Sequence, residues 1–249
     1  MNIQTLILDA AQKRGLRHST VYSYQGLFKR LGIVDDSLTK EEVESLLLSI
    51  DNINTRRATA MACRSVLGLP VHVPAARPKR YPDLPDEDSI RLALMQSKYE
   101  VRGLLMAFGG LRLGEACAVT GSQLEGDRLT VDRQVIELHA TPDRPRVMRL
   151  APTKSREGVV ILPNFLCPLV EPLRGTETPG AVREGIKRAG QKVGVHLTPH
   201  MLRHWYSTES LKRGMAIATL SKQLRHSNVA ITMNTYAQPR DQEVRDVWG

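Results

Sequence analysis

The sequence predicts a mainly helical protein of two domains, the second of which contains a small antiparallel β-sheet. Three observations predict this fold class. Residues 1 to about 70 have apolar residues at helical spacing and no strand pattern. A proline-rich, basic segment separates them from the rest of the chain. Between residues 128 and 162 three β-rich runs follow one another, with turn residues between them.

Residues 1–72 are predicted to form a bundle of four short helices. The first two have amphipathic patterns, and Gly32 is expected to end the second. Thr39 and Glu42 form a capping-box pattern ahead of the third helix. The fourth is expected to run from about residue 54 to residue 67.

Residues 73–85 are predicted to be an extended linker, because prolines recur there and keep the chain stretched. A basic extended segment between two domains can lie along a nucleic-acid backbone. The last predicted helix of the bundle also carries arginines, for which a solvated charged face is an equally good explanation. The candidate phosphate contacts are Arg56, Arg57, Arg77, Lys79 and Arg80.

The charge of the chain favours a polyanionic partner. Its 249 residues carry a formal net charge of +9, which suits nucleic acid or an anionic surface. An aromatic content of 4% argues against a single-strand binder that stacks bases. The sequence has no apolar run long enough to cross a bilayer and no signal-peptide pattern, so a cytoplasmic protein without a membrane is expected. Three cysteines without a C-x-x-C pair predict neither disulfides nor a cysteine zinc site.

The second domain, residues 86–249, is predicted to begin with two helices, near 86–95 and 99–108. The string GGLRLGE follows, in which two glycines fit a tight turn that brings Arg112 to the surface of a site and Glu115 begins a helix. The β-rich runs RLTVDRQVIEL, RVMRLAPTK and GVVILP predict one three-stranded antiparallel sheet. Lys154 lies where the second strand turns into the third.

The stretch from residue 198 to residue 236 concentrates the groups suited to phosphate chemistry. Thr198 is a good N-cap and Pro199 suits the first helical position. His200 and Arg203 then fall one turn apart on the same helix face. His226 follows in an L-x-H-S context, and Tyr236 lies ten residues after it.

In this order and spacing, the motifs resemble the catalytic signature of the tyrosine recombinases. G-L-R-x-x-E carries Arg112 and Glu115, H-x-x-R carries His200 and Arg203, and His226 precedes the tyrosine, Tyr236. Lys154 resembles the family's β-hairpin lysine, with Arg146, Arg149 and Arg156 as rival cations nearby. The resemblance implies a SAM-like core-binding domain followed by an α+β catalytic domain. Many phage integrases carry an additional N-terminal arm-binding domain; because the first helix is expected to start at about Ile3, no such domain is expected here.

The chemistry can be argued from the residues as well. A phosphodiester repels nucleophiles, so a catalyst must neutralise its non-bridging oxygens, activate an attacking oxygen and protonate the leaving one. Two arginines suit the first task, because their planar forks match phosphate oxygens. Arg112 and Arg203 are assigned this clamp, with His226 as a third donor and Glu115 in support. Tyr236 is assigned as the nucleophile, His200 as its base and Lys154 as the acid.

By resemblance, the protein is expected to be an integrase that inserts or excises a phage or mobile element in a bacterial cell, through a 3′-phosphotyrosyl intermediate and a Holliday junction. Its expected partner is duplex DNA with inverted half-sites, on which four copies assemble, and a DNA-bending or directionality factor is a further possible partner. Free, the chain is expected to be a monomer or weak oligomer. No cofactor, ATP or metal is expected. The alternatives are an Xer-like resolvase or invertase, and a catalytically inactive DNA-binding protein of the same fold.

Two residues depart from the family pattern. Met201 occupies a position that is often acidic in the family, and the other departure lies beside His226. Where the family usually has L-G-H, this chain has Leu224, Arg225 and His226. A glycine there adopts φ > 0 at the end of a helix at little cost. Arg225 is therefore expected either to use another cap or to accept backbone strain.

Overall fold

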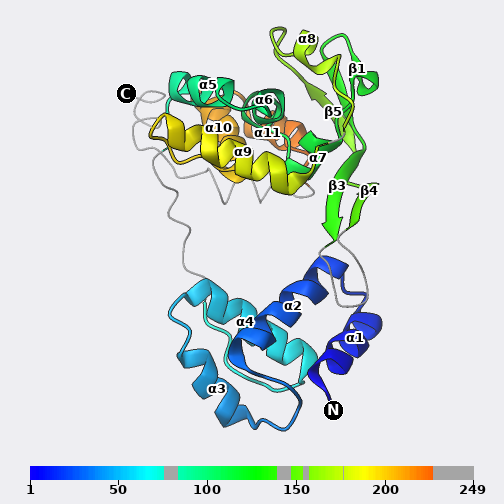
Figure 1. Ribbon diagram of the computed structural model, residues 1–249, viewed down its shortest axis with the longest axis vertical. Coiled ribbons are helices and arrows are strands. Elements are labelled where there is room, and N and C mark those ends of the chain that lie inside the picture. The colour runs from blue at the N-terminus through cyan, green and yellow to red at the C-terminus, as the bar shows by residue number, and fades with distance from the viewer. Residues whose placement is uncertain (76–83, 139–146, 154–156, 176, 227–249) are drawn as a thin grey trace, which may run out of the picture. The chain divides into compact units, whose positions relative to one another are not determined.

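The structure of the chain, a computed structural model, describes residues 1–75, 84–138, 147–153, 157–175 and 177–226. The chain divides into two compact units, Met1–Pro82 and Asp83–Gly249 (Figure 1). Most of the predicted linker, with Arg77, Lys79 and Arg80, lies outside the described residues.

The first unit is built from four helices, α1 (Ile3–Arg14), α2 (His18–Leu31), α3 (Lys40–Leu48) and α4 (Ile53–Val66). The predicted helix ends are confirmed. Gly32 ends α2 with φ of 68°. Thr39 Oγ1 accepts the Glu42 N–H at 3.3 Å, and the Glu42 carboxylate accepts the Thr39 N–H at 2.8 Å. Ile7, Phe28 and Val43 are fully buried between the helices and hold the bundle together.

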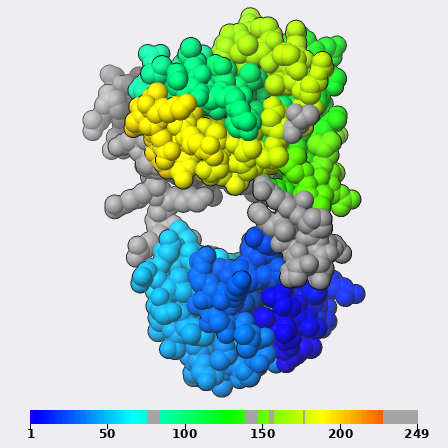
Figure 2. Space-filling model, viewed as in Figure 1, coloured from blue at the N-terminus to red at the C-terminus, as the bar shows by residue number. Residues whose placement is uncertain are grey.

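Helices of the second unit surround α6 (Glu100–Phe108), which is buried from Arg102 to Phe108. A helix that is apolar on every side belongs in the interior, and α5, α9 and α10 all contact it. Figure 2 shows α9 beside α5 and α6 on one face of this unit. The other helices are α5 (Glu87–Met95), α7 (Leu113–Ala118), the 3₁₀ helix Gly121–Gln123, α8 (Cys167–Val170), α9 (Pro179–Lys192), α10 (Pro199–Lys212) and α11 (Ile217–Gln223).

The β-rich runs form two antiparallel sheets, so the single three-stranded sheet predicted from the sequence is wrong. One sheet has the order β1 (Leu124–Glu125), β2 (Arg128–Val131) and β5 (Gly158–Ile161). The other pairs β3 (Arg133–Leu138) with β4 (Val147–Pro152).

Asp132 is the residue that divides the first predicted strand into β2 and β3. Its carboxylate accepts hydrogen bonds from Gln123 Nε2 at 2.7 Å and from Arg133 Nε at 2.8 Å. The chain therefore changes partner at this point: β2 pairs with β5, and β3 pairs with β4. Local side-chain hydrogen bonds of this kind compete with the regular ladder.

The predicted fold class, mainly helical with a small antiparallel β component, is confirmed. None of the helices in the described ranges has both the length and the apolar character needed to span a bilayer.

Candidate active site

The start of α10 positions two of the predicted residues. Thr198 Oγ1 accepts the Met201 N–H at 3.2 Å, and Pro199 occupies the first turn, as predicted. His200 is exposed and lines a pocket, whereas Arg203, one turn later, is only 8% exposed. The same helix thus carries one accessible histidine and one arginine held inside the unit.

Two backbone carbonyls hold the Arg203 guanidinium. Nη1 donates to the Gly110 carbonyl, and Nη2 donates to the Leu224 carbonyl at 2.8 Å. These carbonyls belong to the turn before α7 and to the end of α11, so Arg203 joins three segments that are far apart in the sequence. The planar fork of arginine can make such contacts in fixed directions.

The turn before α7 requires glycine at position 110. Gly110 has φ of 66°, and a Cβ there would lie 2.6 Å from the Tyr206 ring. Both the backbone conformation and the close approach therefore exclude a side chain. The predicted tight turn is confirmed, and it delivers the Gly110 carbonyl to Arg203 and Arg112 to the start of α7.

Glu115 is the centre of the charged cluster, and it is only 1% exposed. Its carboxylate accepts the Arg112 N–H at 2.8 Å, Arg112 Nη1 at 2.9 Å and Arg225 Nη2. Arg203 Nη1 lies 4.0 Å from the same carboxylate. Burial raises the pKa of Glu115, but the charge of Arg225, the hydrogen bond from the Arg112 N–H and the charges of Arg112 and Arg203 outweigh it and hold the pKa below its usual range.

His226 completes the cluster from the residue after Arg225. Its Nε2 lies 3.1 Å from Arg203 Nη2. Burial, followed by the charges of Arg203, Arg112 and Arg225, lowers the pKa of His226 to about 4. The imidazole is therefore neutral at pH 7. Because an arginine can only donate, Nε2 accepts in this contact and the ring proton sits on Nδ1.

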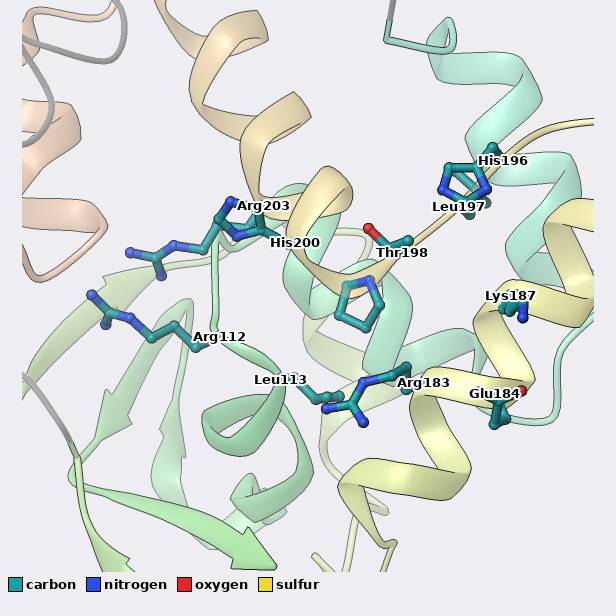
Figure 3. Close-up of a pocket in the computed structure, with 11 residues that line it drawn as sticks. Arg112, Leu113, Arg183, Glu184, Lys187, His196, Leu197, Thr198, His200 and Arg203 are labelled. Atoms are coloured by element: carbon teal, nitrogen blue, oxygen red, sulfur yellow. The ribbon is translucent and has the colours of Figure 1, made fainter. Parts of the chain in front are cut away.

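Arg112 and Arg203 of this cluster line a pocket of about 620 Å³ (Figure 3). Arg112 is the most accessible arginine of the cluster, with 32% of its side chain exposed. In Figure 3 the side chains of Arg112 and Arg203 extend in the same direction, from the start of α7 and from α10. The pocket is lined by Arg112, Leu113, Arg183, Glu184, Lys187, His196, Leu197, Thr198, Pro199, His200 and Arg203.

Several predicted residues lie elsewhere. Lys154 and Tyr236 are outside the described residues. In the first unit, Arg56 Nε donates to the Ile50 carbonyl at 2.9 Å, and Arg57 Nη1 donates to the Pro74 carbonyl at 2.6 Å. Both arginines thus have a partner within their own unit, and their contact with DNA stays a prediction.

Three basic residues of this region were not predicted from the sequence as site residues: Arg183, Lys187 and Arg225. Arg183 and Lys187 lie one turn apart on α9 and form a wall of the pocket. The spacing was visible in the sequence, but nothing in it indicated that α9 would border the start of α10. The departure from the family pattern at Arg225 did not indicate that its guanidinium contacts Glu115.

The arrangement is suited to binding a phosphate-like anion. Three guanidinium groups surround one carboxylate and one neutral imidazole, so the cluster carries a net positive charge beside an open pocket. Within the described ranges, no group of three or more His, Cys, Asp or Glu residues gathers as metal ligands do.

Comparison with known proteins identifies the class. The sequence profile of the phage integrase family matches residues 83–243. Transposase A from transposon Tn554 of Staphylococcus aureus is 28% identical over 166 residues, which cover 57% of this chain and 44% of that protein. The tyrosine recombinase XerA of Thermococcus kodakarensis is 29% identical over 148 residues, 52% of this chain and 47% of that protein. The alignments thus span about half the length of these relatives.

A solved structure has the same fold along almost the whole chain. The integrase of transposon Tn1549, in complex with transposon right end DNA, aligns with a TM-score of 0.73 and 18% identity over 99% of this chain and 98% of that one. The chain belongs to the phage integrase family of tyrosine recombinases. The resemblance inferred from the motifs is therefore confirmed.

Proposed function

We propose that this chain is a tyrosine-type site-specific DNA recombinase that integrates or excises a mobile element. The observation that carries the proposal is that Arg112 and Arg203, which both line a basic pocket, meet at the buried Glu115 carboxylate, with His226 Nε2 3.1 Å from Arg203 Nη2. Membership of the phage integrase family supports it. Transposase A of Tn554 and the Tn1549 integrase are transposon proteins by name, which supports a mobile element as the DNA.

In the proposed reaction, Arg112 and Arg203 neutralise the non-bridging oxygens of one phosphodiester. The Tyr236 oxygen attacks phosphorus and gives its proton to His200. The 5′-oxygen leaves and takes a proton from Lys154. The product is a 3′-phosphotyrosyl bond and a 5′-hydroxyl, and attack by the hydroxyl of another strand reverses the step. The bond energy is retained, so the step uses neither ATP nor metal.

The fork of Arg203 supports its role in the clamp. Contacts to the Gly110 and Leu224 carbonyls fix the guanidinium before any substrate binds. A preformed cation costs no reorganisation when charge develops on the phosphate. His226 is neutral at pH 7, so it acts in this proposal as a hydrogen-bond donor through Nδ1 rather than as a third cation.

Basic side chains around the cluster are proposed to contact neighbouring phosphates. Arg183 and Lys187 extend the pocket wall along α9 (Figure 3). Each phosphate contact adds affinity that weakens as salt rises. The predicted contacts of the linker and the first unit, Arg56, Arg57, Arg77, Lys79 and Arg80, belong to the same proposal.

We further propose that residues 1–72 form a core-binding domain, residues 73–85 a linker and residues 86–249 the catalytic domain. Four copies would then act on two DNA sites with inverted half-sites, in the cytoplasm of a bacterial host. An Xer-like resolvase or invertase is the second candidate, because a tyrosine recombinase named XerA is among the relatives. Recombination of DNA sites that flank the gene supports the integrase, whereas recombination at a chromosomal site far from the gene supports the resolvase.

The covalent intermediate is the direct test. A nicked DNA site that loses a short 5′-hydroxyl fragment should trap a protein–DNA adduct that resists denaturant, with or without EDTA. Tyr236→Phe should abolish the adduct. Tyr206→Phe is the matched control, because Tyr206 is 8% exposed and burial raises its pKa, which makes it a poor nucleophile. No adduct with the wild-type chain would support the inactive DNA-binding protein, and an adduct that maps to Tyr206 would reassign the nucleophile.

A further inference from the structure

Arg225 has a backbone conformation that an arginine rarely adopts. Its φ is 53°, and it is the one non-glycine residue with positive φ in the described part of the chain. Glycine adopts this conformation freely, whereas a Cβ makes it costly. A residue held there against its preference points to a compensating interaction elsewhere.

The side chain of Arg225 supplies that interaction. The residue is only 4% exposed, although it lies just beyond Leu224, the C-cap of α11. Nη2 donates to the Glu115 carboxylate, and Nη1 donates to the Gln223 carbonyl at 3.0 Å. A Cβ on Gly158, at the start of β5, would lie 3.4 Å from the arginine's Cγ and Cδ, so the aliphatic stem runs past that strand.

Glu115 uses its two oxygens differently. Oε1 accepts Arg112 Nη1, while Oε2 accepts both the Arg112 N–H and Arg225 Nη2 and lies 4.0 Å from Arg203 Nη1. Arg112 and Arg203 line the pocket, whereas Arg225 is not among its lining residues. The charged contact between Arg225 and Glu115 joins residues 110 positions apart in the sequence.

We propose that Arg225 is a positioning residue, which fixes the Glu115 carboxylate so that Arg112 and Arg203 present one preformed fork to a phosphodiester. This inference rests on the proposed function for its role in the reaction. In this arrangement, the buried ion pair between Arg225 and Glu115 offsets the conformational cost of a positive φ, which a glycine would not have. The guanidinium also keeps a positive charge beside the site without exposing it to DNA.

Arg225→Gly separates this role from a purely structural one. Glycine suits φ of 53°, so the backbone at position 225 is relaxed in the variant while the contact to Glu115 is lost. Arg225→Lys keeps a charge but not the planar fork. Lys222→Ala is the control, because it removes one positive charge from an exposed position on the neighbouring α11.

The first measurement uses the chain without DNA. The ¹⁵N side-chain signals of Arg112 and Arg203, assigned with Arg112→Lys and Arg203→Lys, report how firmly each guanidinium is held. In Arg225→Gly both signals should move or broaden, and in Lys222→Ala both should stay in place. Unchanged signals in Arg225→Gly would show that Arg225 does not position the clamp.

The second measurement is the rate of adduct formation on the nicked DNA site. Arg225→Gly should lower the rate about ten- to a hundredfold, which is the loss typical when a group that orients a metal-binding side chain is removed. Arg225→Lys should recover only part of the rate. DNA affinity should stay within about twofold of wild type, because many phosphate contacts share it. A wild-type rate in Arg225→Gly would contradict the proposal. If the wild-type chain forms no adduct, the proposed function fails, while the arginine signals still decide whether Arg225 positions the clamp.

Discussion

Replacing Glu115 by glutamine keeps the shape of the side chain and removes its charge from a site that is 1% exposed. Arg225, whose side chain is 2% exposed, would then be a buried cation without its anion. Removing one partner of a buried ion pair costs about 3–5 kcal/mol. The amide oxygen of glutamine can still accept one hydrogen bond, so we expect a loss near the lower end, about 3 kcal/mol.

That loss is large compared with the stability of a typical domain, about 5–15 kcal/mol. For a unit of this size each kcal/mol lowers the melting temperature by about 2–4 °C. Glu115→Gln should therefore melt roughly 6–12 °C below wild type. Tryptophan fluorescence is the suitable probe, because both tryptophans, Trp205 and Trp248, belong to the second unit.

Acid should remove the difference between the two proteins. The pKa of Glu115 is held below its ordinary value of 4.5, so its charge stabilises the fold above pH 4.5. This contribution is lost as pH falls through the lower folded-state pKa, where wild type resembles the variant. Glu209→Gln is the control, since Glu209 pairs with Arg213, whose side chain is 60% exposed, and should lose less than about 1 kcal/mol. A Glu115→Gln variant within about 1 kcal/mol of wild type at pH 7 would refute the reasoning.

Four further predictions concern the clamp, His226 and the pocket. Arg203→Lys should lower the rate of adduct formation by about 10²–10³-fold and leave DNA affinity nearly unchanged. The reason is that a point charge cannot hold the Gly110 and Leu224 carbonyls and a phosphate together. Near-normal cleavage would contradict the role of Arg203 in the clamp. An NMR titration should place the pKa of His226 at about 4 and show it rising in Arg203→Ala, which removes one cause but not burial; an unchanged value would mean that Arg203 has no part in the shift. Because the unfolded chain binds this proton first, His226 should also make the fold less stable as pH falls from 6.5 towards 4. Lys187→Ala should reduce the slope of log DNA affinity against log salt concentration by about 1. Lys192 is an exposed residue of α9 that does not line the pocket, so Lys192→Ala should leave the slope unchanged. Equal slopes for wild type and both variants would exclude the phosphate contact of Lys187.

The features determined by the sequence alone are those that depend on neighbours within one helical turn. The Thr39 and Glu42 capping box, the αL end of α2 at Gly32 and the N-terminus of α10 at Thr198 all follow from local hydrogen bonds and backbone preferences. The order and spacing of the motifs were also sufficient for the family, which the match to residues 83–243 confirms. Nothing in these features requires knowledge of a distant contact.

The tertiary structure decided everything that depends on which distant segments meet. Strand pairing is non-local, so the sequence could not show that the chain changes partner at Asp132 and forms two sheets. It could not show that α9 contributes Arg183 and Lys187 to the pocket at the start of α10. The same limit holds for Arg225. Its positive φ was one of the two outcomes expected because a glycine is missing there. Its partner, Glu115, lies 110 residues away in the sequence, so only the tertiary fold brings the two charges together.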